Sequence, residues 1–212
     1  MCMQQLILKD IFLQRTIFLI CFIFPFYGML KQSIEPYQLA TVCFATCLFM
    51  ILFSIVTEEK NSTEKILVSL PCTRKEIVIA KYISTAFFIM AGFIITCVLL
   101  IVPVLLFRDH INIPWYALLI AGFFSILYAA MILPMKYSGN KQMFTIFGIV
   151  ILFPIFGLQG FMCNVFAEER LMLMFFQSSN VMLVISILSI VAWMSYFISM
   201  FVSIIIFKQR EF

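Results

Sequence analysis

The stretch EEKNSTEKILVSLPCTRKEIVIAK, residues 58–81, decides how the rest of the chain is arranged. It contains nine of the 24 charged residues in the 212-residue sequence, whereas the runs 37–57 and 82–107 on either side contain none. An ionised side chain at the centre of a bilayer costs about 2.5–3.5 kcal/mol on insertion scales, so nine of them cannot lie there. The stretch is therefore a polar loop between two membrane-spanning segments.

The composition of the whole chain supports the same class of protein. It is 64% hydrophobic and 11% charged, with a mean hydropathy of +1.13, whereas soluble domains carry about 25% charged residues. The length leaves no room for a soluble domain beside the spans. We therefore expect an all-α polytopic membrane protein with one membrane domain over residues 1–212.

The apolar runs predict six spans, since about 20 residues are needed to cross a bilayer. These spans are expected at about 16–30, 37–57, 82–107, 114–135, 143–166 and 181–207. Residues 3–15 have near-helical apolar spacing, which fits either an interfacial helix or the start of the first span. Pro154, Gly157 and Gly160 weaken the fifth span, and we interpret 161–177 as a re-entrant or interfacial element before the sixth.

The distribution of basic residues predicts the orientation. Eleven of the 14 Lys and Arg residues fall on the side of the 58–81 loop and both termini. Lys31, Arg108 and Arg170 are the three on the other side. Because cytoplasmic loops carry the excess of Lys and Arg, we expect a multi-pass protein of the cell membrane with both termini in the cytoplasm.

The cysteines and the only histidine, His110, give no signal for a metal or a disulfide framework. Cys43 and Cys47 share a helix face, so they could form a metal pair, but small apolar fillers between helices is the interpretation we favour. We therefore expect no metal site.

The sequence also lacks the residues that an enzyme or an ion-coupled carrier requires. No Gly-x4-Gly-Lys-Ser/Thr motif occurs, so the chain cannot cradle nucleotide phosphates itself. No Asp, Glu, Lys, Arg or His falls near the middle of a predicted span, which disfavours ion-coupled transport and catalysis. Without a histidine nearby, we interpret the serines of the spans as helix-packing hydroxyls. They are Ser84, Ser125, Ser186, Ser189, Ser195, Ser199 and Ser203.

The polar loop contains signals for structure of its own. Asn61 and Glu64 have the spacing of a capping box, and so do Thr73 and Glu76, while Pro71 between them ends a helix. The predicted product is a short helix, a corner, and a new helix that runs into the membrane. Such a unit could relay a push from a soluble partner, or it could simply lie on anionic lipid.

The loop resembles the one between the second and third spans of type-2 ATP-binding-cassette (ABC) export permeases. It is most similar to small six-span bacterial members for peptide or antibiotic export and immunity, such as those of phenol-soluble modulin exporters. The residues that match are Glu58, Glu59, Lys60, Ser69, Leu70, Pro71, Thr73, Arg74, Lys75, Glu76, Ile77, Ala80, Lys81 and Tyr82. Residues 136–141, KYSGNK, resemble the family's second cytoplasmic loop, with Gly139 nearer to Lys141 than usual.

The resemblance implies that the loop carries a coupling helix, which docks on a nucleotide-binding ATPase subunit. ATP and Mg would then be held by that partner, and this chain would bind no cofactor. The residues implied in docking are Glu58, Glu59, Lys60, Glu64, Lys65, Ser69, Leu70, Pro71, Thr73, Arg74, Lys75 and Glu76. A second permease copy or a related permease would complete a homo- or heterodimer in the bilayer, with no nucleic acid involved.

We therefore expect the membrane subunit of an ATP-driven exporter, and not an enzyme. Its 26 Phe and 14 Met residues favour a hydrophobic or amphipathic cargo, such as a membrane-active peptide. The alternative is a non-transporting sensor or immunity subunit that binds an antimicrobial peptide at the outer face.

Overall fold

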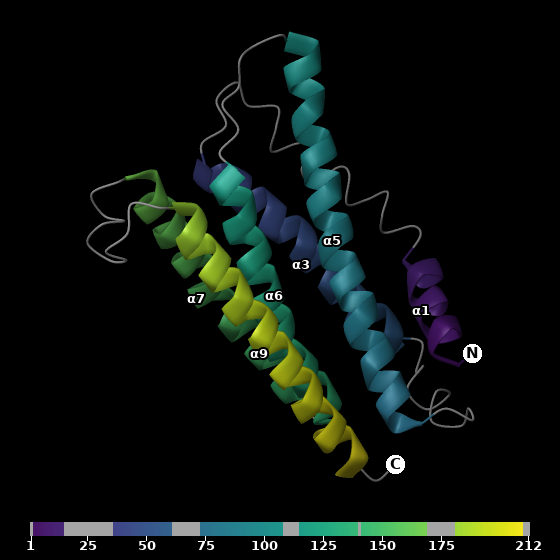
Figure 1. Cartoon of the computed structure of the whole chain (residues 1–212). Helices are drawn as coiled ribbons and strands as arrows, with labels where there is room; N and C mark the ends of the chain where they lie inside the picture. Colours follow the sequence, from purple (N-terminus) through teal and green to yellow (C-terminus); the bar gives the residue numbers. More distant parts are fainter. Residues whose placement is uncertain are drawn as a thin grey trace.

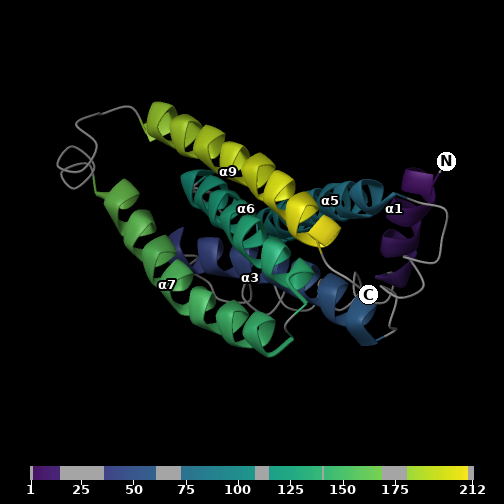
Figure 2. The same cartoon turned by 90° about the horizontal axis from the view of Figure 1, so that it is seen from below.

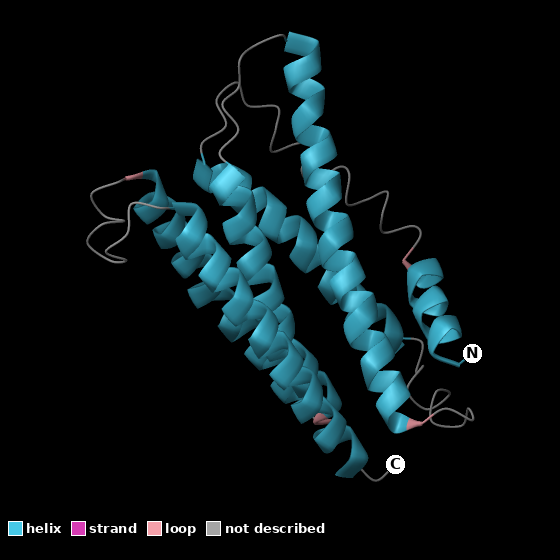
Figure 3. Cartoon of the chain, viewed as in Figure 1, coloured by secondary structure: helices cyan, strands magenta, loops and turns pink. Residues whose placement is uncertain are grey.

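Helices form the regular structure of the described residues (Figures 1 and 3). The computed structural model of the chain describes residues 2–14, 36–60, 73–107, 115–139, 141–168 and 181–209. Its helices are α1 (Cys2–Leu13), α3 (Pro36–Lys60), α5 (Arg74–Phe107), α6 (Trp115–Tyr137), α7 (Lys141–Ala167) and α9 (Val181–Gln209). All of these except α1 are long and apolar enough to cross a membrane. The prediction of an all-α polytopic membrane protein is confirmed, while the predicted first span, 16–30, lies outside the described residues.

Helix α6 is the centre of the arrangement. It packs against α9 on one side and against α3 and α7 on the other (Figure 2). Helix α5 packs against α3 and α9, and α1 lies against α5. Helix α5 has 34 residues, or about 50 Å at 1.5 Å per residue, so it is longer than the ~30 Å hydrocarbon core.

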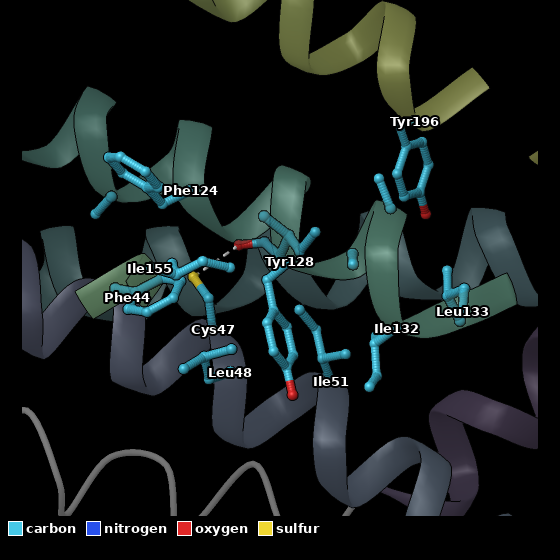
Figure 4. Close-up of a cluster of buried hydrophobic side chains, with 14 of the residues drawn as sticks. Phe44, Cys47, Leu48, Ile51, Phe124, Tyr128, Ile132, Leu133, Ile155 and Tyr196 are labelled. Carbon is cyan, nitrogen blue, oxygen red and sulfur yellow. Dashed lines mark hydrogen bonds between the residues drawn. The ribbon is translucent and has the colours of Figure 1, made fainter. Parts of the chain in front are cut away.

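The core between α3, α6 and α7 is made of large apolar side chains (Figure 4). Phe44 and Ile51 of α3 are fully buried there, together with Tyr128 of α6. Phe44 also meets Phe156 of α7 edge-on, with ring centroids 4.9 Å apart. These contacts fix the order in which the helices stand around α6.

Helices α3 and α5 approach each other closely at Gly92. A Cβ at this position would lie 3.0 Å from Cys47 Sγ and 3.2 Å from Cys47 Cα, so a side chain there would push the helices apart. Cys43 and Cys47 are fully buried at the helix contact. Their positions agree with the interpretation of these cysteines as small fillers.

Helix α6 continues past Pro134. Proline has no N–H, so it cannot donate to the carbonyl of Ala130, four residues earlier. That carbonyl instead accepts a hydrogen bond from the Ser199 hydroxyl of α9. Because a neighbouring helix satisfies the freed group, the helix continues to Tyr137, where Gly139 (φ 84°) turns the chain toward α7.

Helix α7 agrees with the fifth span expected at 143–166, since it continues through Pro154 to Ala167. Residues 161–167, the first part of the predicted re-entrant or interfacial element, are the end of this helix. Gly160 is a packing residue here, because a Cβ at this position would lie 2.8 Å from the ring of Tyr37 on α3. The rest of the predicted element, 169–177, lies outside the described residues.

Helix α1 ends at Leu13, where Gln14 forms a turn by donating its N–H to the carbonyl of Ile11 at 3.2 Å. This ending favours a separate helix over the start of a span. The Gln14 side chain also donates to Met50 O on α3 at 3.2 Å, which anchors α1 to the bundle. In Figure 1, α1 lies at the same end of the bundle as the start of α5 and the end of α9.

Candidate functional site at the base of the polar loop

The capping box that the sequence predicts at Thr73 and Glu76 is present at the start of α5. Thr73 N–H donates to Glu76 Oε2 at 2.9 Å, and Glu76 N–H donates to Thr73 Oγ1 at 3.3 Å. The two residues therefore satisfy each other's free N–H groups, as a capping box does. Residues 61–72, with the other predicted capping box and Pro71, lie outside the described residues.

Arg74 joins the start of α5 to the end of α9. Its Nη1 donates to the carbonyl of Lys208 at 3.0 Å and to that of Phe207 at 3.4 Å. The last carbonyls of a helix lack partners within the helix and carry partial negative charge, which suits a guanidinium. The ring of Phe207 also packs against Tyr137 of α6, with centroids 5.1 Å apart. The entry to α5 is thus fixed against two other helices.

A cluster of five charged residues lies beside this entry, and we call it the charge clasp: Lys9 and Asp10 of α1, Glu58 of α3, Lys81 of α5 and Lys136 of α6. Glu58 is its centre. Its carboxylate pairs with Lys81 at 3.0 Å, with Lys9 at 3.4 Å and with Lys136. The first and last residues of the quoted loop sequence, Glu58 and Lys81, are therefore in direct contact.

Asp10 completes the clasp from α1. Its carboxylate pairs with Lys9 at 3.2 Å and with Lys81 at 3.6 Å. Lys81 Nζ also donates to Ser54 Oγ on α3 at 2.7 Å. The clasp thus draws four helices together at one end of the bundle.

The clasp is shielded from water. Asp10, Glu58, Lys81 and Lys136 are each between 4% and 7% exposed. Burial raises the pKa of Asp10 above its ordinary value, although Lys81 opposes this shift by favouring the charged form. Buried charges of this kind are tolerated only when they are paired, and removing one partner costs about 3–5 kcal/mol.

A second network, of hydrogen bonds, connects α5, α6 and α9. It is centred on Tyr82, the residue that follows Lys81 on α5. Tyr82 Oη is hydrogen-bonded to Ser199 Oγ at 2.8 Å and to Ser203 Oγ at 2.7 Å. The Tyr196 hydroxyl donates to the carbonyl of Tyr82 at 2.7 Å. Ser199 and Ser203 therefore act as the helix-packing hydroxyls that the sequence predicts. A displacement of the first turns of α5 cannot occur without straining these bonds to α9.

The residues predicted to dock on an ATPase fall into four groups. Glu58 faces into the bundle. Thr73 caps α5, and Arg74, Lys75 and Glu76 lie in its first turn, with Lys75 exposed. Glu59 and Lys60 are the last residues of α3. The remaining predicted docking residues, Glu64, Lys65, Ser69, Leu70 and Pro71, lie outside the described residues. Docking by any of these residues stays a prediction.

Sequence reasoning missed the role of Asp10 and Lys136. Lys81 and Tyr82 were recognised only as matches to a family motif. For Asp10, Lys81 and Lys136 the available signal was a charged residue next to an apolar run, but their ion-pair partners on other helices lie far away in sequence, 78 positions for Lys136 and Glu58. Such pairs follow only once the helices are placed side by side.

The apolar helices and the charged cluster at one end of their bundle define an integral membrane protein. Within this class, a family model described as "ABC-2 family transporter protein" matches residues 5–208. The chain therefore belongs to the ABC-2 family of transporter proteins. Neither the curated proteins nor the solved structures include a significant match to it.

Proposed function

We propose that the chain is the permease subunit of an ATP-driven ABC exporter in a bacterial cell membrane, with both termini in the cytoplasm. A separate ATPase subunit would dock on the 58–81 loop and supply ATP and Mg. The observation that carries the proposal is the charge clasp. It holds both ends of the loop, through Glu58 and Lys81, to the helices that a docked partner would have to move.

The base of the loop is suited to transmit a mechanical push. Helix α5 is continuous from Arg74 to Phe107, so force applied at its first turn acts on a single stiff rod. Arg74 and Tyr82 connect that rod to α9, and the clasp connects it to α3 and α6. A flexible attachment would absorb the movement before it reached the spans. In this proposal Glu58 acts from inside the bundle, while the exposed Lys75 is available to the ATPase.

The cargo that we propose is a hydrophobic or amphipathic molecule, and a membrane-active peptide in particular. The described spans expose apolar side chains along α7 and α9, and the ionised groups of the clasp lie at one end of the bundle. A peptide cargo and outward direction are proposed from the resemblance of the 58–81 loop to peptide export permeases. A second permease copy, or a related permease, would form the other half of the pathway.

Transport into inside-out vesicles tests this function. Vesicles that contain the chain, together with the nucleotide-binding subunit that co-purifies with it, should accumulate a fluorescently labelled amphipathic helical peptide only when ATP is present. Omitting the nucleotide-binding subunit is the matched control and should abolish uptake. Peptide binding to the outer face of intact cells, without ATP-dependent accumulation in the inside-out vesicles, would contradict export and favour the sensor or immunity alternative.

A further inference from the structure

A hollow of about 270 Å³ lies between α5, α6 and α9, and we call it the apolar groove. Its lining repeats one pattern on three helices. On α5 (86–93) and α6 (119–126) the lining residues occupy positions i, i+3, i+4 and i+7. On α9 (189–196) they occupy positions i, i+4 and i+7. These positions share one face of a helix over two turns. The groove therefore runs about 10 Å parallel to the helix axes, at 1.5 Å per residue.

The middle of the groove is hollow because of Gly122. A Cβ built on this residue of α6 meets no atom within 4 Å, so the space in front of it is empty. Ile89 and Tyr196 form the floor and are 6% and 5% exposed. The rim is open, since Met90 is 55% exposed and Trp193 is 40% exposed.

The groove offers its occupant almost no polar contact. The Ser189 hydroxyl donates to the carbonyl of Ile185 in its own helix, and the Tyr196 hydroxyl donates to the carbonyl of Tyr82. The lining carries no charged side chain. An apolar cavity of about 150 Å³ stays dry and binds apolar molecules, so a hollow of about 270 Å³ has room for a segment of a hydrocarbon chain.

The position of the groove identifies its occupant. Trp193 lies 12 residues after the start of α9 and 16 before its end, and Ile89 lies 15 residues after the start of α5. At about 1.5 Å per residue, both are near the middle of a span, where the surroundings are hydrocarbon. The open rim is continuous with exposed apolar residues that face the same medium, such as Ile94 and Phe197.

We propose that the apolar groove is a binding site for one acyl chain of a bilayer phospholipid. The chain lies parallel to the helices against Gly122, with its headgroup at the membrane surface. The acyl chain fills a space that the protein's own side chains leave empty, and it contacts α5, α6 and α9 at the same time. The inference requires only that these helices span a bilayer, so it is independent of cargo and direction.

Quenching of Trp193 fluorescence by brominated phospholipid tests the proposal. Because the chain has two tryptophans, the Trp115→Phe variant leaves Trp193 as the sole reporter. This variant is purified in dodecyl maltoside and titrated with phosphatidylcholine brominated in the middle of its acyl chain. We expect quenching that saturates at one phospholipid per chain.

Gly122→Leu in the Trp115→Phe background should weaken the saturable quenching by about tenfold or more, because the leucine side chain occupies the groove. Gly157→Leu is the matched control: its Cβ also meets no atom within 4 Å, but Gly157 lies on α7, away from the groove. It should leave the quenching unchanged. Gly122→Ala, which adds a single methyl group, should give an intermediate loss, and it replaces Gly122→Leu if the latter does not fold.

Two results would overturn the proposal. Quenching that rises linearly without saturation, and equally in all variants, would mean that Trp193 meets only exchanging lipid. An absence of quenching in every variant, together with a dimer on gel filtration, would mean that a second copy of the chain covers the groove.

Discussion

Glu58 is the residue on which the charge clasp depends. It pairs with three lysines from three other helices, whereas Asp10 supplies the only other carboxylate of the cluster. Neutralising Glu58 would leave three cations facing one acid in a site with little water. A buried charge that has lost its partner is strongly destabilising.

We predict that Glu58→Gln lowers the free energy of unfolding by about 3–5 kcal/mol, the usual cost of breaking a buried ion pair. Thermal or denaturant unfolding of the purified chain in detergent measures it. Glu168→Gln, the same change at an exposed position, serves as the control and should have an effect within about 0.5 kcal/mol. Equal stability of the two variants would show that the clasp contributes little.

The burial of Asp10 leads us to predict that the stability of the chain depends on pH. Burial raises its pKa in the folded chain above the ordinary 3.8, so the folded state holds this proton more tightly than the unfolded state does. The contribution of Asp10 to the free energy of unfolding is therefore fully present below pH 3.8, and it is lost as the pH rises through the raised pKa. Asp10→Asn cannot lose a proton, so it lacks this decline.

The Tm difference between Asp10→Asn and the wild type should accordingly shift in favour of Asp10→Asn as the pH rises from below 3.8 to neutrality. Taking the difference at each pH removes the contributions of the other carboxylates. A difference that moves in the opposite direction would mean that Lys9 and Lys81 outweigh the burial of Asp10.

At the scale of helices, a hydrogen bond from α9 allows α6 to continue past Pro134. Pro134 leaves the carbonyl of Ala130 without its usual donor, and Ser199 supplies one. We predict that Ser199→Ala lowers the free energy of unfolding by about 1 kcal/mol less in a Pro134→Ala background than in the wild type. Alanine at 134 has an N–H that can bond to the carbonyl of Ala130, so the Ser199 hydroxyl is no longer needed there. A double-mutant cycle of unfolding free energies measures the difference, and strictly additive effects would contradict the account.

The helices were predictable from the sequence to the extent that their signals are local. The apolar runs predicted α3, α5, α6, α7 and α9, and the Thr73 and Glu76 spacing predicted where α5 begins. The local signals did not show how Pro134 and Gly160 are accommodated within their helices. Ser199 compensates for the first, and Tyr37 packs on the second, and each of these contacts comes from another helix.

The candidate site was predictable only in part for the same reason. The sequence identified the 58–81 loop and its capping residues, since charge and capping are properties of short segments. It did not predict that Lys136 and Asp10 meet Glu58, because nothing local determines which helix faces of α1, α3 and α6 come together. The packing around α6 determines those partners.

For the whole molecule, the base of the loop is where four other described helices are fixed to the start of α5. Helix α1 is fixed to it by Asp10, α3 by Glu58, α6 by Lys136 and α9 through Arg74. A permease that receives force from outside the membrane needs such a rigid point of entry. The central claim is therefore that the start of α5 faces a cytoplasmic ATPase subunit.

Photocrosslinking in intact cells tests that claim most directly. The photoreactive amino acid p-benzoyl-phenylalanine is placed at Lys75, exposed in the first turn of α5, or at Trp115, exposed at the start of α6. These helix starts lie at opposite ends of the bundle (Figure 1). The account predicts an adduct with a nucleotide-binding ATPase subunit from position 75 and none from position 115. The absence of an adduct from position 75, or its formation from position 115, would contradict it.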